Sequence, residues 1–353
     1  MKFRLLFVGL ALGLCTIFAP VMAIAGFDEG KFAFDKKDFA KALQEFNPLA
    51  SQGDSRAQLS LGLMYQNGLG VAQDDQEAAK WYRLAAEQGS MSAQYNLGTL
   101  YANGKGVPND DAEAVKWFRL AANQGSINAQ YGIGLMYNYG RGVAQDDREA
   151  LKWYRLAADK GDVSAQTNLG WMNENGRGTP VNHTEAVQWY RLAADQGDAK
   201  AQTNLGGMYV SGKGVRQNFK EAMNWYRLAA DQGYVSAQYS LGWMYETGKD
   251  RPVDFKEAIK WYRLAAEQGH ARAQSALGWM FENGQGVAPS RVVAYALNNL
   301  SAVNDPSTAN RALASRSVLE KLMSTKDIAA AQALTRALAK PGDFLKALDG
   351  YVP

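Results

Sequence analysis

Residues able to perform chemistry are scarce in this sequence. Its 353 residues include two histidines, His183 and His270, and a single cysteine, Cys15. A metal site of the zinc kind needs several His or Cys ligands, and a catalytic nucleophile needs a base beside it. We therefore predict no metal, no cofactor and no catalytic residue. Both histidines lie near the start of a helical segment without a neighbour suited to general-base work, and we expect both to be solvated.

Two further sequence patterns resemble motifs found in enzyme active sites and in phosphate-binding sites. Paired acids such as Asp74-Asp75 are similar to the carboxylate pair of a glycosidase, and Gly104-Lys105-Gly106 is similar to a phosphate-binding loop. A phosphate loop, however, requires Gly-Lys followed by Ser or Thr after a buried strand. Both patterns recur regularly along the chain, at helix starts and between helices, which favours capping and turning of the chain. The sequence thus predicts a protein that is not an enzyme.

These patterns recur because the chain is built from a unit of 36 residues. A Lys-Trp-Tyr-Arg-Leu-Ala-Ala motif or a close variant of it places tryptophans at Trp81, Trp117, Trp153, Trp189, Trp225 and Trp261. An Ala-Gln pair keeps the same interval and begins at Ala57, Ala93, Ala129, Ala165, Ala201, Ala237 and Ala273. A fixed period of about 20 to 50 residues is typical of a solenoid.

Each unit predicts two helices joined by a glycine turn. In residues 54–66 the apolar residues recur at the spacing of one helix face, and they are Ala57, Leu61, Met64 and Tyr65. Gly68 and Gly70 then end the helix and turn the chain. The second helix starts with Asp74, followed three residues later by Glu77, a pair that caps helix starts. Its expected buried residues are Ala78, Trp81, Tyr82 and Ala85.

This pattern resembles the Sel1-like repeat family, whose members are relatives of the tetratricopeptide repeats. The resemblance implies an all-α fold, an α/α superhelical solenoid of about seven to eight 36-residue repeats over residues 54–305, with an incomplete repeat at 26–53. The last repeat has Leu297 where Trp is expected, and atypical end repeats suit a solenoid because its end must present a polar face. Inside the repeats, Asn173 replaces a Tyr, and Asp250 replaces a loop glycine, where we expect a locally different turn.

The tail at residues 306–353 leaves the repeat register. Its segments 311–322, 327–338 and 343–348 have helical composition. We interpret the tail as a helical C-terminal cap on the solenoid, with a separate functional module as the alternative.

The first residues predict export. Lys2 and Arg4 precede an apolar run without charges that extends to about Phe18, and Ala23-Ile24-Ala25 ends the segment. These features are typical of a bacterial signal peptide at residues 1–25, with cleavage before Gly26. An uncleaved anchor is the alternative, although the apolar run is short for a membrane span of about 20 residues. We expect a periplasmic or secreted chain without cysteine, and no membrane insertion after cleavage.

A candidate partner-binding face lies opposite the core face of each first helix. Three positions per unit vary there while the rest of the unit stays constant, and all three tryptophans outside the repeated motif occupy them. The candidate residues for a partner-binding groove are Tyr95, Tyr131, Trp171, Glu174, Tyr239, Trp243, Glu246, Trp279 and Glu282. In the related tetratricopeptide repeats the matching face lines a concave groove for peptides and proteins. The alternative is that these aromatics pack against the next helix as extra core.

The predicted function is therefore an exported scaffold or adaptor that binds a protein or peptide segment. Aromatic residues with a few acids favour a segment that is apolar with basic residues. The alternatives are a peptidoglycan or carbohydrate binder, since Trp and Tyr also stack on sugars, and a modulator of an envelope enzyme. A net charge of +3 indicates no nucleic-acid partner. Neither the partner's identity nor an oligomeric state is indicated.

Overall fold

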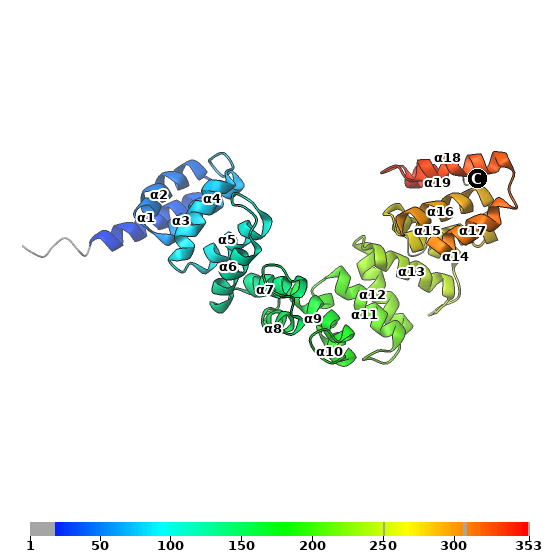
Figure 1. Ribbon diagram of the computed structural model, residues 1–353, viewed down its shortest axis with the longest axis horizontal. Coiled ribbons are helices and arrows are strands. Elements are labelled where there is room, and N and C mark those ends of the chain that lie inside the picture. Colours follow the sequence, from blue (N-terminus) through cyan, green and yellow to red (C-terminus); the bar gives the residue numbers. More distant parts are fainter. Residues whose placement is uncertain (1–17, 250, 306–308, 352–353) are drawn as a thin grey trace, which may run out of the picture. The chain divides into compact units, whose positions relative to one another are not determined.

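The regular structure of the described residues is entirely helical. The computed structural model describes residues 18–249, 251–305 and 309–351, and these ranges contain 19 α-helices and no strand (Figure 1). The all-α class and the solenoid of helix pairs are thereby confirmed. By its internal contacts the chain divides into two compact units, one ending at Ala165 and the other starting at Gln166.

The helices follow one another with short connections. In the first unit they are α1 (Phe18–Asp35), α2 (Phe39–Ser51), α3 (Ser55–Asn67), α4 (Asp75–Glu87), α5 (Met91–Asn103), α6 (Asp111–Asn123), α7 (Ile127–Tyr139) and α8 (Asp147–Ala158). The division falls within α9 (Val163–Asn175). The second unit continues with α10 (His183–Asp195), α11 (Ala199–Ser211), α12 (Phe219–Asp231), α13 (Val235–Thr247), α14 (Phe255–Glu267), α15 (Ala271–Asn283), α16 (Arg291–Asn304), α17 (Ala309–Glu320), α18 (Thr325–Leu338) and α19 (Phe344–Asp349).

The core of each repeat lies between its two helices and the next pair. In α3 the predicted residues Ala57, Leu61 and Met64 are fully buried, and in α4 the most enclosed ring is Tyr82. Trp81 is only half-buried, so the ring at the centre of the repeat is the tyrosine and not the tryptophan of the motif. The small residue Gly62 makes room for this ring, because a Cβ there would lie 2.5 Å from the ring of Tyr82.

The second helices begin as the sequence predicts, with one difference. The side chain of Asp74 accepts hydrogen bonds from the backbone N–H groups of Gln76 and Glu77, and so caps α4. Glu77 does not reach back to complete the cap, because the backbone N–H of Asp74 already donates to the carbonyl of Tyr65. Glu77 instead pairs with Lys80 on the surface of the same helix. The first acid of the pair, Asp74, is thus a capping group, and the second, Asp75, lies in the first turn of the helix.

The Gly-x-Gly turns have two separate structural purposes. The first glycine of each turn, such as Gly104, takes the left-handed conformation (φ 63°) that ends the first helix. The second, Gly106, approaches the preceding repeat so closely that a Cβ would lie 2.0 Å from the carbonyl oxygen of Asp75. Turning and close approach therefore account for the motif. The different turn expected at Asp250 lies outside the described residues.

The N-terminal helices form a pair of the same kind. Ala42 and Phe46 of α2 are buried, and a Cβ at Gly30 of α1 would lie 2.6 Å from the ring of Phe46. Residues 1–17 of the predicted signal peptide lie outside the described residues, and α1 runs through its predicted cleavage point before Gly26. No helix of the part that the structure describes is both long and apolar enough to span a bilayer.

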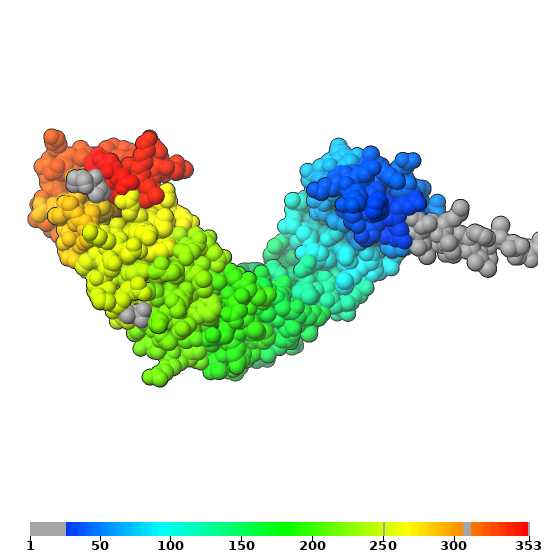
Figure 2. All heavy atoms as spheres, turned by 180° about the vertical axis from the view of Figure 1, so that it is seen from behind, coloured from blue at the N-terminus to red at the C-terminus, as the bar shows by residue number. Residues whose placement is uncertain are grey.

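The tail forms three helices that pack on the last repeat. Helices α17 and α18 contact α16, and α19 contacts α18 and α14. Leu334, Leu338 and Phe344 are buried in the same cluster as the last repeats, and Arg263 forms an ion pair with Asp349. In Figure 2 the red C-terminal residues lie against the yellow and orange surface of these repeats. The tail thus covers apolar surface that a further repeat would otherwise cover.

Candidate functional site

The nine candidate residues lie on first helices, in both units. Tyr95 of α5 and Tyr131 of α7 belong to the first unit. The second unit holds Trp171 and Glu174 on α9, Tyr239, Trp243 and Glu246 on α13, and Trp279 and Glu282 on α15. We consider the tyrosines, the tryptophans and the acids in turn, because the structure gives each type a different environment.

The three candidate tyrosines are half-buried against rings of the following helix. The ring centroids of Tyr95 and Phe118, of Tyr131 and Tyr154, and of Tyr239 and Tyr262 are each 5.7 Å apart. One side of each candidate ring therefore contributes to the core, as the alternative interpretation of the face expects. Part of each ring nevertheless remains exposed.

The candidate tryptophans differ in exposure. Trp171 and Trp279 leave 38% and 45% of their surface exposed, which is unusual for so large an apolar side chain. Trp243 is half-buried and packs against the core of the second unit. The guanidinium of Arg177, in the turn after α9, lies 5.7 Å from the ring centre of Trp171, within range of a cation–π contact. Trp171 and Trp279 are therefore the surface residues, and Trp243 belongs partly to the framework.

Two of the three candidate acids are engaged within the chain. Glu174 accepts a hydrogen bond of 2.7 Å from the hydroxyl of Tyr190, and Glu246 accepts one from that of Tyr262. Burial raises the pKa of both phenols, and the neighbouring carboxylate raises it further. These carboxylates hold framework rings in place, a role that the sequence analysis missed. No hydrogen bond joins Glu282 to another described residue.

The spacing of these pairs was visible in the sequence. In each case the acceptor lies 16 residues before the tyrosine, and Gln66 accepts from Tyr82 in the same way at 2.6 Å. Where the second helix carries Phe118, which has no hydroxyl, the corresponding residue is Ala102, which has no acceptor. The spacing does not identify the pair in every repeat, because Tyr226 has a hydroxyl while the corresponding residue is Val210, which has no side-chain acceptor.

Five of the candidate residues come together around one hollow in the second unit. Its volume is about 700 Å³, and it is lined by Tyr239, Trp243, Glu246, Trp279 and Glu282. The remaining lining residues are Tyr262, Arg272, Ser275, Ala276, Asn298 and Ser315. Ser315 comes from α17, so the tail contributes one side of the hollow. Tyr95, Tyr131, Trp171 and Glu174 do not line it.

A histidine at the edge of this region departs from the expectation of a solvated residue. His270 is half-buried, and its ring stacks on Tyr239 with the centroids 4.7 Å apart. Its Nδ1 accepts a hydrogen bond of 3.2 Å from the backbone N–H of Ala273, so that His270 is the N-cap of α15. Burial lowers the pKa of His270, and the charge of Arg272 lowers it further. The expectation was wrong because the N-cap position faces the preceding repeat. His183 is also partly buried.

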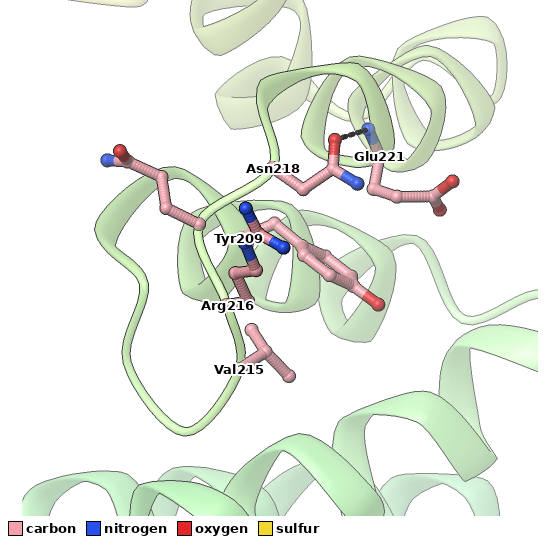
Figure 3. A pocket seen from close by; sticks show the side chains of 6 residues that line it. Tyr209, Val215, Arg216, Asn218 and Glu221 are labelled. Atoms are coloured by element: carbon pink, nitrogen blue, oxygen red, sulfur yellow. Dashed lines mark hydrogen bonds between the residues drawn. The ribbon is translucent and has the colours of Figure 1, made fainter.

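A second hollow of about 550 Å³ belongs to the repeat framework. Figure 3 shows it beside the turn between α11 and α12, lined by Tyr209, Val215, Arg216, Gln217, Asn218 and Glu221. Asn218 caps α12 by accepting a hydrogen bond from the backbone N–H of Glu221, and Tyr209 accepts one from Arg191. Asn218, Tyr209 and Gln217 are thus already engaged within the repeat. Among the described residues, no three His, Cys, Asp or Glu side chains are grouped so as to hold a metal ion.

Comparison with known proteins identifies the repeat. The Sel1 repeat family matches residues 55–90, 92–126, 127–162, 163–198, 199–234, 235–270 and 271–298. The crystal structure of a protective antigen present in uropathogenic Escherichia coli strains, which displays an SLR fold, is 36% identical over 93% of this chain and 69% of that chain, with a TM-score of 0.79. A Sel1 repeat protein from Oxalobacter formigenes is 32% identical over 69% of this chain and 96% of that chain, with a TM-score of 0.60. No curated protein matches the chain.

Proposed function

We propose that this chain, which belongs to the Sel1 repeat family, is an exported adaptor that binds a segment of a partner protein at the hollow between α13 and α15. Sel1 repeat proteins mediate protein–protein interaction, so the family supports the general activity. The location, the binding residues and the kind of partner are the specific parts of the proposal.

The observation that carries the proposal is the convergence of variable aromatic residues on one hollow. Five of the residues that vary from repeat to repeat line the same space of about 700 Å³, although Tyr239, Trp243 and Glu246 also pack on the framework. Trp279 is 45% exposed there, although an indole is among the largest apolar side chains. Exposed aromatic residues beside a pocket are typical of the few residues that contribute most to protein binding.

The polar groups of the hollow favour a segment that is apolar with basic residues. Glu246 and Glu282 contribute negative charge, and Arg272 is the one basic side chain among the lining residues. The indoles of Trp243 and Trp279 offer faces on which aliphatic stems and cationic groups both pack well. The two carboxylates disfavour acidic segments.

The proposal includes no catalytic step. Sel1 repeat scaffolds are in general not enzymes. In this chain the first acid of each pair, such as Asp74, caps a helix, and the glycine turns are explained by left-handed geometry and by close approach. Export is proposed from the basic and apolar beginning of the sequence, with the periplasm or the cell exterior as the location.

The test is site-specific crosslinking in the full chain, produced in its own envelope. A photoreactive phenylalanine derivative replaces Trp279, and the matched control carries it at Glu267, an exposed residue of α14 outside the hollow. The proposal predicts a discrete protein adduct from position 279 and not from 267. Equal adducts from both positions, or none from 279, would contradict it.

Two other products of the same experiment would replace the proposal. An adduct with glycan in place of protein would favour a peptidoglycan or carbohydrate binder. An adduct with an enzyme whose activity changes on addition of this chain would favour a modulator of an envelope enzyme. The first alternative rests on the flat, exposed faces of Trp171 and Trp279, which suit sugar rings.

A further inference from the structure

The last repeat lacks a ring that the six repeats before it possess. In those repeats an aromatic residue of the second helix covers a glycine of the first helix, with ring atoms 2.5–2.8 Å from where a Cβ would lie. The covering rings are Tyr82, Phe118, Tyr154, Tyr190, Tyr226 and Tyr262. In the last repeat the glycine is Gly278, and the atoms that cover it belong to Asn298, at 3.2 Å. An amide replaces a ring, so the outer part of the ring's space is left open.

The last repeat still carries the side chain that would accept a hydrogen bond from the hydroxyl of such a ring, and it is Glu282. In three other repeats the ring's hydroxyl donates to the residue 16 positions earlier, for example from Tyr262 to Glu246. The same spacing relates Asn298 to Glu282, but no hydrogen bond joins either side chain to another described residue. Asn298 is only 2% exposed and lines the hollow of about 700 Å³. The polar atoms of Asn298 are open to the hollow, so a ligand there could supply them with a hydrogen-bond partner.

The groups around this space favour one kind of ligand. Glu282 and Glu246 supply negative charge, the amide oxygen of Asn298 is a further acceptor, and the indoles of Trp243 and Trp279 supply flat faces. An arginine side chain suits all of them, because its planar guanidinium donates several hydrogen bonds and stacks on indoles. A lysine ammonium is a compact point charge that stacks less well, and a tyrosine carries no charge to complement the carboxylates.

We infer that the hollow between Asn298 and Glu282 accepts one arginine side chain of the partner segment. Glu282 and Asn298 accept hydrogen bonds from the guanidinium, and Trp243 and Trp279 form the walls. The inference rests on the proposed function, since it names the residue that anchors the proposed partner. Arg272 also lines the hollow and is exposed.

The test uses the full chain and N-acetyl-arginine amide as the probe. Binding is followed by the indole N–H resonances of Trp243 and Trp279 in nitrogen-15 spectra, assigned with Trp→Phe variants. N-acetyl-citrulline amide has the same shape without the charge, and we expect it to bind at least about tenfold more weakly, since it loses the charge-assisted bonds. Equal binding of the two probes, or tighter binding of N-acetyl-tyrosine amide, would overturn the assignment.

Two variants locate the site. Asn298→Tyr restores the ring of the other repeats and should abolish the resonance shifts by filling the space. Glu282→Gln keeps the shape and removes the charge, so it should weaken arginine binding about tenfold or more without changing the melting curve. Glu267→Gln, outside the hollow, is the matched control. Arginine binding that survives Glu282→Gln unchanged would overturn the inference even if Asn298→Tyr does not fold.

The outcomes separate this inference from the proposed function. If the protein adduct from position 279 forms while the arginine probe does not bind, the hollow binds a partner protein but its anchor is not an arginine. If the probe binds but no adduct forms, the hollow accepts an arginine side chain, and the proposed binding of a partner protein is wrong.

Discussion

The carboxylate of Glu246 accepts a hydrogen bond from the hydroxyl of Tyr262, a ring of the next helix that lies over Gly242. Glu246 also lines the hollow that we propose as the binding site. One residue therefore belongs to both the framework and the recognition surface. This double role means that stability and binding must be measured side by side for every variant of the face.

The glycine beneath the ring provides a direct test of the packing. Gly242→Ala would place a Cβ 2.6 Å from the ring of Tyr262, whereas Gly278→Ala would place one 3.2 Å from the shorter side chain of Asn298. We expect Gly242→Ala to lower the free energy of unfolding by about 1–3 kcal/mol through overpacking, and Gly278→Ala to lower it less. Urea denaturation of both variants measures the difference. A greater loss for Gly278→Ala would show that the rings are not the constraint.

Framework and surface tryptophans should separate in stability. Trp261 is 5% exposed and its indole N–H has no hydrogen-bond partner among the described residues, so Trp261→Ala should cost about 3–5 kcal/mol in packing alone. Trp171→Ala and Trp279→Ala should each cost less than about 1 kcal/mol, as exposed substitutions do. Trp243→Ala should fall between, because its ring is half-buried. Thermal melts that place Trp279→Ala beside Trp261→Ala would show that Trp279 is core.

His270 should make stability depend on pH. Its pKa is lowered from the ordinary 6.5, mainly by burial and further by Arg272, while Asp305 acts in the opposite direction. Between 6.5 and the lowered value the unfolded chain binds a proton that the folded chain does not. The free energy of unfolding should therefore fall as the pH falls from above 6.5 through the lowered pKa.

The control for this prediction is His270→Asn, which keeps an N-cap acceptor but does not titrate. Denaturation curves of the two proteins at pH 7.5 and at pH about 5 isolate the contribution of the histidine, because the carboxylates titrate in both. A His270→Asn variant with the same pH dependence as the natural protein would show that the stacked ring titrates as it does in water.

Export should leave a defined new N-terminus. The signal-peptide pattern places cleavage before Gly26, so the chain isolated from the envelope or the medium should begin there. N-terminal sequencing of the isolated chain is the measurement. A product that keeps Met1 and stays in the cytoplasm would contradict the proposal, and one that keeps Met1 in the membrane would indicate an anchor.

The fold could be predicted from the sequence because the repeat is strict. Each Ala57 or Leu61 recurs after 36 residues, so one unit predicts the rest, and helix caps such as Asp74 are local signals that need no tertiary information. Both Trp81 and Tyr82 were expected to be buried, and the structure fully buries only Tyr82, since composition does not distinguish the two when both lie near the buried face. Which of two neighbouring rings is enclosed depends on the stacking of the next repeat.

The candidate site was predictable only in part. Residues such as Trp279 were visible because they vary where the framework does not. The role of Glu246 depends on a contact across 16 residues, and the hollow depends on Asn298 in the second helix and on Ser315 in the tail. The 36-residue period places each residue within its repeat, but it does not reveal contacts between the two helices of a repeat or between a repeat and the tail.

The affinity for the partner captured at position 279 tests the central claim most directly. We predict that the double substitution of Trp243→Ala and Trp279→Ala weakens binding of this partner by at least about 2 kcal/mol, roughly thirty-fold. Circular dichroism should show that the doubly substituted chain remains folded. Trp153→Ala, a half-buried framework change in the first unit, should leave the affinity unchanged. Titration calorimetry of the purified pair gives both values. An affinity that survives the double substitution would show that the partner binds elsewhere and that the aromatic hollow is not the recognition site.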